Sequence, residues 1–82
     1  MTNEQKLQDS FVRVLDLDPT QVNDDLKYQG VPQWDSIAHM DLIDDLENVF
    51  GVSFETEQIL GMSSYARARE ILQQSFGVDF SV

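Results

Sequence analysis

The fold of this chain is decided by residues 34–52, WDSIAHMDLIDDLENVFGV. Apolar residues recur here at three- and four-residue spacing, the pattern of an amphipathic helix. Asp35 can cap the first turn, and its charge suits the positive end of the helix dipole. Gly51 favours the backbone conformation that ends a helix. The stretch therefore predicts a helix that begins at Asp35–Ser36 and ends near Phe50.

The two sides of this predicted helix differ in polarity. The apolar side consists of Ile37, Leu42, Ile43, Leu46, Val49 and Phe50. The polar stripe consists of Asp41, Asp44, Asp45 and Asn48, at positions i, i+3, i+4 and i+7. We expect the apolar side to pack on a core and the acidic stripe to face solvent.

The first third of the chain predicts one helix followed by a long loop. Thr2 and Gln5 fit a capping box for a helix from about residue 3 to residue 16. Pro19 disfavours a helical conformation at the preceding residue, so we expect a loop over residues 17–35. Loops of this length are usually functional or are ordered by buried side chains. The candidates for burial are Val22, Leu26 and Tyr28, and residues 20–26 are expected to form a helical turn.

Two further helices are predicted after Gly51. A short helix is expected over about residues 55–60, ending near Gly61. Ser63 or Ser64 can cap a last helix that runs to about Gln74. The inward residues of this last helix are Tyr65, Ala68, Ile71 and Leu72, and residues 76–80 form a tail. The expected fold class is all-α, since no long stretch alternates at period two.

Length and composition predict one soluble domain. The chain has 82 residues, of which 41% are apolar and 24% charged, so we expect a single domain over 1–82 with its core over about residues 3–75. Its longest apolar runs are too short to cross a membrane, and its first residues lack an apolar signal region. We therefore expect a cytoplasmic protein. Because the chain has no cysteine, any thiol chemistry must come from an attached group.

The charge of the chain is strongly acidic. Its net charge is −10, and residues 28–66 hold seven acidic residues without any Lys or Arg. Such a field repels nucleic acid and anionic lipid, so we expect neither as a partner. It favours basic patches on other proteins. The alternative is that acidity only keeps a small protein in solution.

Catalytic and metal-binding patterns are weak in this sequence. His39 follows Ser36 by three residues, but neither a nucleophile elbow nor an oxyanion glycine surrounds the serine. Asp16, Asp18 and Thr20 begin like a calcium loop, yet the glycine and the closing glutamate are missing. We therefore expect a protein that is not an enzyme and holds no metal.

Ser36 remains the strongest candidate for chemistry. It stands at the predicted start of an acidic helix, directly after a long loop that leaves its hydroxyl accessible. Amide groups and the dipole at a helix start stabilise the negative charge of a phosphodiester. The alternative, that Ser36 is only a residue of a helix cap, is equally compatible with composition and spacing.

Residues 34–52 resemble the phosphopantetheine attachment region of acyl carrier proteins. In that family an Asp-Ser-Leu triplet opens a helix that carries acidic residues outward and ends in a Glu-x-x-Phe-like element. The expected short helix at 55–60, and the run Met62-Ser63-Ser64 before Tyr65, are similar as well. The likeness covers about residues 5–73. It implies an acyl-carrier-like four-helix bundle with three main helices, one short helix and a long first loop.

The resemblance also implies a role for each matching residue. Ser36 would carry 4′-phosphopantetheine, transferred covalently from coenzyme A by a phosphopantetheinyl transferase with magnesium, and Asp35 would help to position it. The mouth in which the arm or a short acyl chain rests would be lined by Ile37, Met40 and Met62, although core packing explains these three equally well. The partner-binding acids would be Asp41, Asp44, Asp45 and Glu47, facing basic patches on acyl-loading and acyl-using synthases or transferases.

The function implied is a monomeric carrier of acyl thioesters for fatty-acid or polyketide-type biosynthesis. Departures from the housekeeping carriers favour a specialised pathway. These departures are Trp34, Ile37, Ala38, His39 and Arg69. Two alternatives remain: an aminoacyl or peptidyl carrier, and an unmodified acidic helical adaptor. A further hypothesis places the charge of His39 beside the phosphodiester, one turn after Ser36.

Overall fold

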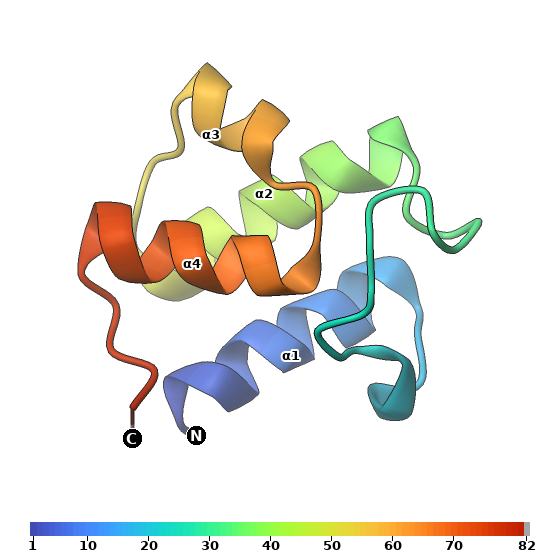
Figure 1. The fold of residues 1–82 in the computed structure, drawn as a ribbon, viewed down its shortest axis with the longest axis horizontal. Coiled ribbons are helices and arrows are strands. Elements are labelled where there is room, and N and C mark those ends of the chain that lie inside the picture. Colours follow the sequence, from blue (N-terminus) through green and yellow to red (C-terminus); the bar gives the residue numbers. More distant parts are fainter. Residues whose placement is uncertain (82) are drawn as a thin grey trace.

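A computed structural model describes residues 1–81 and contains only helices as regular elements. In chain order these are α1 (Asn3–Leu15), the 3₁₀ helix η1 (Pro19–Gln21), α2 (Ser36–Phe50), α3 (Thr56–Gly61) and α4 (Tyr65–Phe76), as Figure 1 shows. The all-α class, with three main helices and one short one, is confirmed. Over the described residues, none of the helices has the length and apolar character needed to cross a bilayer.

Local capping chemistry sets the helix ends. The predicted capping box of Thr2 and Gln5 begins α1, and Asp16 ends it in a left-handed conformation with φ 53°. Gly51 ends α2 in the same conformation. Ser64 caps α4, which continues to Phe76, two residues beyond the predicted end at Gln74. The final turns persist because Gly77, with φ 67°, is the first residue to adopt the left-handed terminating conformation.

The long loop is ordered by buried side chains, as expected, but its helical turn begins earlier and is shorter than expected. Val22 and Leu26 are buried and Tyr28 is partly buried. The helical turn expected over residues 20–26 is η1 at Pro19–Gln21, so it begins one residue earlier than expected and is shorter. Asp18 caps this turn and Pro19 opens it, so the local sequence starts the turn early. Val22 then returns to an extended conformation.

The core lies where α1, α2 and α4 face one another around a tryptophan from the loop. Trp34 is completely buried, and its ring meets Phe11 edge to face with ring centroids 5.2 Å apart. Phe11 meets Tyr65 in the same way at 5.0 Å. The inward residues predicted for α4 are all buried, as are Leu42, Ile43 and Leu46 of α2. The sequence analysis did not expect Trp34 in this core.

Ile37 corrects the predicted apolar side of α2. Its side chain is 76% exposed. At about 100° per residue, Ile37 falls roughly 180° around the helix axis from Leu46, which is buried in the core. The apolar pattern was therefore broader than the face that the other helices cover.

The tail returns to the body of the molecule. Phe76, at the end of α4, meets Phe54 edge to face at 5.3 Å, and Phe80 lies 6.3 Å from Phe50 between ring centroids. The Asn3 side chain donates a hydrogen bond to the Asp79 carbonyl oxygen at 2.8 Å, so the two ends of the described chain lie side by side (Figure 1). The expected domain extends to residue 82, which lies outside the described residues.

Candidate functional site

Ser36 lies at the junction between the long loop and α2. It is the first residue of the helix and is exposed, so its hydroxyl is accessible from solvent. Asp35, also exposed, caps the helix: its Oδ1 accepts a hydrogen bond from the Ala38 amide at 2.8 Å. The structure thus brings the two residues together as the sequence predicted, at the positive end of an acidic helix.

The segment before Ser36 is fixed by its backbone. The amide of Trp34 donates to the Val31 carbonyl at 3.2 Å, and the carbonyl of Trp34 accepts from the Gln29 amide at 3.0 Å. Gly30 completes the preceding turn by donating to the Lys27 carbonyl oxygen at 2.8 Å. A Cβ at Gly30 would lie 2.9 Å from that oxygen, so the turn requires glycine. The exposed serine therefore follows a loop segment that is held by backbone hydrogen bonds.

His39 points into the molecule. Its Nδ1 accepts a hydrogen bond from the Trp34 indole Nε1–H at 3.0 Å, and its Nε2 lies 2.8 Å from the Ile59 carbonyl oxygen on α3. These partners assign the neutral tautomer with the proton on Nε2, because Nδ1 faces a donor and Nε2 faces an acceptor. The idea of a His39 charge beside Ser36 does not fit this placement, since both ring nitrogens are engaged inside the fold.

A small cavity lies beside His39, between α2, α3 and the end of the long loop. Its volume is about 110 Å³, and its lining consists of Tyr28, His39, Ile59, Leu60, Met62 and Ser63. Met62 is the only predicted mouth residue in this lining, and it is also buried in the core. Met62 is therefore both a core residue and part of the cavity lining.

The other two predicted mouth residues lie on the surface. Ile37 is 76% exposed and Met40 is 48% exposed, and neither lines the cavity. Leu60 of α3 is 79% exposed as well. The places of Tyr28 and Ile59 in the cavity lining were not predicted from the sequence. The inward direction of His39 could have been predicted, because His39 precedes Leu42 by three residues and such a spacing places both on the same face of a helix.

The four predicted partner-binding acids fall into two pairs. Asp41 and Asp44 are exposed, and within residues 1–81 their side chains form no hydrogen bond or ion pair. Asp45 binds the guanidinium of Arg13 from α1 at 3.2 and 3.0 Å. Glu47 accepts a hydrogen bond from the Phe54 amide at 2.7 Å. Two of the four acids therefore hold the fold together, and two are presented to solvent.

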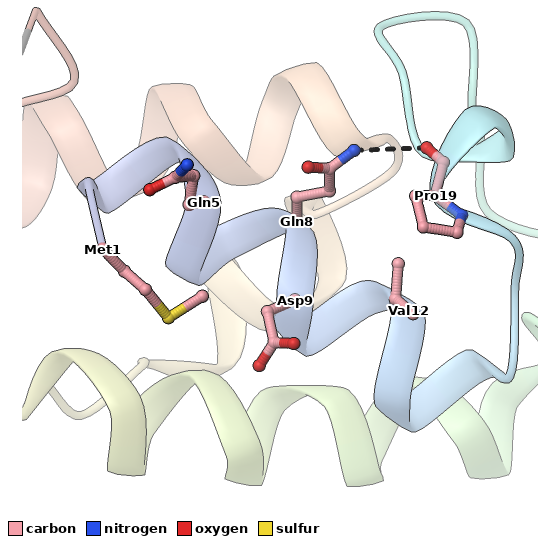
Figure 2. A pocket seen from close by; sticks show the side chains of 6 residues that line it. All are labelled: Met1, Gln5, Gln8, Asp9, Val12 and Pro19. Atoms are coloured by element: carbon pink, nitrogen blue, oxygen red, sulfur yellow. Dashed lines mark hydrogen bonds between the residues drawn. The ribbon is translucent and has the colours of Figure 1, made fainter.

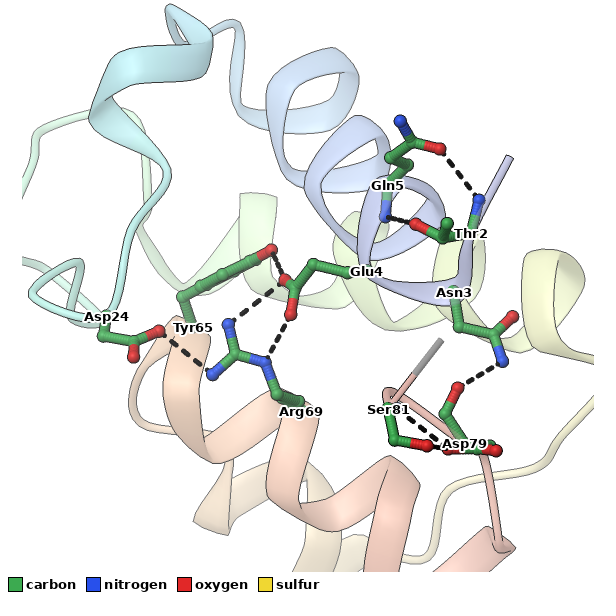
Figure 3. Close-up of polar contacts among 9 residues, drawn as sticks. All are labelled: Thr2, Asn3, Glu4, Gln5, Asp24, Tyr65, Arg69, Asp79 and Ser81. Carbon is green, nitrogen blue, oxygen red and sulfur yellow. Dashed lines mark hydrogen bonds and ion pairs between the residues drawn. The ribbon is translucent and has the colours of Figure 1, made fainter.

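Arg69, one of the departures from the carrier pattern, organises a polar cluster that includes none of the predicted site residues. The cluster consists of Glu4, Asp24, Tyr65 and Arg69, and we call it the Arg69 cluster (Figure 3). Arg69 binds both carboxylate oxygens of Glu4, at 2.8 and 3.1 Å, and Asp24 at 3.0 Å. Its guanidinium carbon also lies 5.1 Å from the centre of the Tyr65 ring. The hydroxyl of Tyr65 donates to Glu4.

Mutual contacts shift the pKa values in the Arg69 cluster. Burial raises the pKa of Tyr65, and its hydrogen bond to Glu4 raises it further. Hydrogen bonds to Glu4 and Asp24 outweigh partial burial and raise the pKa of Arg69. Burial alone would raise the pKa of Glu4, but hydrogen bonds from Arg69 and Tyr65 lower it overall from its ordinary value of 4.5. These directions describe a charge network that stabilises the fold.

A second hollow, along α1 and beside η1, contains none of the predicted site residues. It has a volume of about 250 Å³ and is lined by Met1, Gln5, Gln8, Asp9, Val12 and Pro19 (Figure 2). The Gln8 side chain donates to the Pro19 carbonyl oxygen at 3.2 Å and ties η1 to α1. The residues expected to carry function lie on the loop end, on α2 and at Met62, and none of them lines this hollow.

Comparisons with known proteins give this chain no relatives: no family model, no curated protein and no solved structure matches it significantly.

Proposed function

We propose that this protein is an acyl carrier that holds a 4′-phosphopantetheine arm on Ser36. The observation that carries the proposal is the exposed Ser36 at the first residue of α2, inside the stretch that resembles the carrier attachment region. Asp35 caps the same turn, so the serine is held at a defined place in the helix start.

The residues around Ser36 are compatible with the arm. The first amides of a helix lack intrahelical partners, and they and the helix dipole favour the negative charge of a phosphodiester. When Ser36 is modified, its hydroxyl gives up its proton to the transferase or to solvent and its Oγ forms a bond to the phosphorus of the phosphopantetheine unit of coenzyme A. The pyrophosphate bond breaks, and adenosine bisphosphate leaves. The arm supplies the thiol that a chain without cysteine lacks. The chain itself catalyses nothing, but it presents the thioester at high effective concentration.

Partner enzymes would contact the exposed part of α2 and its neighbour α3. Asp41 and Asp44 are available to basic side chains of a phosphopantetheinyl transferase or of acyl-loading and acyl-using synthases. Exposed apolar side chains lie on the same two helices, at Ile37, Met40 and Leu60. Asp45 and Glu47 are weaker candidates because their carboxylates already hold Arg13 and the Phe54 amide. Charge would guide encounter, and the apolar side chains would add contact area.

The cargo that we propose is a fatty-acyl or polyketide-type group of a specialised pathway in the cytoplasm. The cavity of about 110 Å³ beside His39 has room for no more than a short chain of the cargo. An aminoacyl or peptidyl carrier would use the same serine. An unmodified acidic adaptor would use Asp41 and Asp44 without it.

Intact mass measurement tests the proposal. The protein is incubated with coenzyme A, magnesium and a broad-specificity phosphopantetheinyl transferase. We expect a gain of one phosphopantetheinyl unit in the wild type and in Ser53→Ala, a matched change at another exposed serine. Ser36→Ala should gain nothing. If several transferases fail to modify the wild type, or if Ser36→Ala is modified as well, the carrier proposal is wrong and the acidic adaptor becomes the function to test.

A further inference from the structure

Two of the residues that depart from the carrier pattern, Trp34 and His39, meet inside the fold. We propose that Trp34 and His39 are positioning residues that brace the Ser36 junction for modification, through the hydrogen bond between their side chains. This inference rests on the proposed function, because it concerns the same serine. It adds a device that the family resemblance does not imply.

The bond closes a short loop around Ser36. Trp34 stands two residues before the serine and His39 three residues after it. The 3.0 Å bond from the indole Nε1–H to His39 Nδ1 therefore joins the chain on both sides of the exposed serine. The backbone adds a second link, from the His39 amide to the Asp35 carbonyl at 2.9 Å. These two bonds restrain the backbone on both sides of Ser36, so the serine stays at the first position of α2.

The brace itself is immobilised by burial. Trp34 is completely buried, and its ring is held edge to face by Phe11 at 5.2 Å and by Tyr28 at 6.0 Å. His39 is buried too, and its ring is nearly parallel to the indole, at 24°. A polar atom in such surroundings is costly to leave without a partner, so the indole and the imidazole keep their bond.

The carbonyl oxygen of Ile59 determines which tautomer His39 adopts in the brace. Nε2 of His39 lies 2.8 Å from this oxygen, which requires a proton on Nε2 and leaves Nδ1 as the acceptor for the indole. The same contact ties the first turns of α2 to α3. The position of α3 and the geometry of the Ser36 junction are thereby coupled through one imidazole ring.

A loosened brace should affect recognition more than the chemical step. If the variant holds the junction in the competent arrangement for only about a fifth of the time, the apparent KM for the carrier rises about fivefold. The kcat of the transferase changes little, because the bound, ordered carrier reacts as before. A KM effect without a kcat effect is therefore the expected signature.

A spectroscopic measurement on the unmodified full chain tests the geometry independently of any modification. We expect the His39 ring nitrogens to give ¹⁵N resonances of an unprotonated Nδ1 and a protonated Nε2. We also expect slow exchange of the Trp34 indole proton, which His39→Leu should accelerate at least tenfold, as opening of a buried bond does. The opposite tautomer, or an indole proton that exchanges equally fast in both proteins, would overturn the brace.

Transferase kinetics with coenzyme A and magnesium test its role. His39→Leu and Trp34→Phe should each raise KM for the carrier about fivefold. His39→Asn places an amide oxygen near the position of Nδ1, so it should restore KM to within about twofold of wild type, whereas His39→Gln reaches only toward Ile59 and should not. Glu4→Gln is a control elsewhere in the fold, since it weakens the Arg69 cluster and removes no contact of Trp34, His39 or Ser36.

The outcomes separate the brace from the carrier function. A modified wild type with unchanged KM in His39→Leu leaves the carrier proposal standing and overturns the positioning role. A KM that rises equally in Glu4→Gln also overturns it, because general loss of stability would then explain the effect. A wild type that is never modified fails the proposed function itself, and the positioning role falls with it.

Discussion

Two of the contacts that fasten the long loop to the helices are of opposite kinds. The Trp34–His39 brace is buried and neutral, and it joins an indole, an imidazole and a backbone carbonyl. The Arg69 cluster is charged and open to water: the Arg69 side chain is 24% exposed and that of Asp24 is 68% exposed. The brace links a loop residue through His39 to α3, and the cluster links a loop residue through Arg69 to α1.

The difference in burial predicts that the two fastenings contribute differently to the free energy of unfolding. An unmatched polar atom in the interior bears the full cost of lost hydration, about 1–3 kcal/mol. Exposed ion pairs are screened by water and salt and contribute about 0–1 kcal/mol each. The neutral brace should therefore matter more for stability than the charged cluster, although the cluster contains more contacts. The following predictions test this comparison, beginning with the largest effect.

Trp34→Ala should be the most damaging change at either place. It removes the indole from the centre of the core, leaves a cavity beside Phe11 and deprives His39 Nδ1 of its donor. Loss of a large buried aromatic side chain costs about 3–5 kcal/mol, a large part of the stability of a small domain. Urea unfolding followed by circular dichroism measures the loss. A cost below about 1 kcal/mol would mean that Trp34 is not buried as described.

His39→Leu should cost about 1–3 kcal/mol, because the Trp34 indole and the Ile59 carbonyl both lose their partner. The measurement is again the free energy of unfolding, at low and at high salt. The cost should be independent of salt, since no charge is removed from a pair. A strong salt dependence would contradict the neutral tautomer that the hydrogen bonds assign.

Arg69→Met should cost about 1 kcal/mol, less than His39→Leu, and the cost should shrink as salt rises. Methionine keeps most of the side-chain length beside Tyr65 while removing the pairs with Glu4 and Asp24. The same unfolding experiment serves, with His39→Leu beside it. If Arg69→Met proves the more costly change in high salt, the ranking of the two fastenings is reversed.

Acid should weaken the Arg69 cluster through Glu4. Its pKa is lowered in the folded protein from the ordinary 4.5, so the folded state favours the ionised carboxylate. The stabilisation is therefore present above about pH 4.5 and is lost as pH falls through the lower folded pKa. Because Glu4 is partly exposed, the stabilisation that its ionised form contributes is below about 1 kcal/mol.

The check on this pH effect is a comparison of wild type with Glu4→Gln. At pH 7 the wild type should be the more stable protein, and the difference in unfolding free energy should vanish as the carboxylate is protonated. A difference that stays constant into acid would show that the pairing of Glu4 with Arg69 does not contribute through its charge.

Much of the fold was predictable because its signals are local. The capping box of Thr2, the cap of Asp35 and the stop at Gly51 act within a few residues, and each appears where the sequence places it. The start of the turn in the loop and the end of α4 were harder to predict, because neighbouring residues there favour different helix boundaries. The turn near Pro19 began earlier than expected, and α4 ran on to Phe76, because the terminating conformation waits for Gly77.

The candidate site was predictable only in part. The sequence placed Ser36 and Asp35 at the helix start, since that depends on the pattern of α2 alone. It could not rank the acids of α2, because Asp45 and Glu47 are engaged by Arg13 and by the Phe54 amide, which other segments supply. Nor could it separate Met62, which lines the cavity, from Ile37, which faces solvent.

The sequence by itself determined the helices, the acidic field and the serine that opens α2, since periodicity, capping and charge are properties of neighbouring residues. Only the tertiary structure decided what the remaining residues do. It turned His39 inward onto Trp34 and Ile59, and it joined Arg69 to Glu4 across 65 residues of chain. The physical reason is burial: whether a polar side chain needs a partner, and which partner it finds, depends on the elements that pack over it.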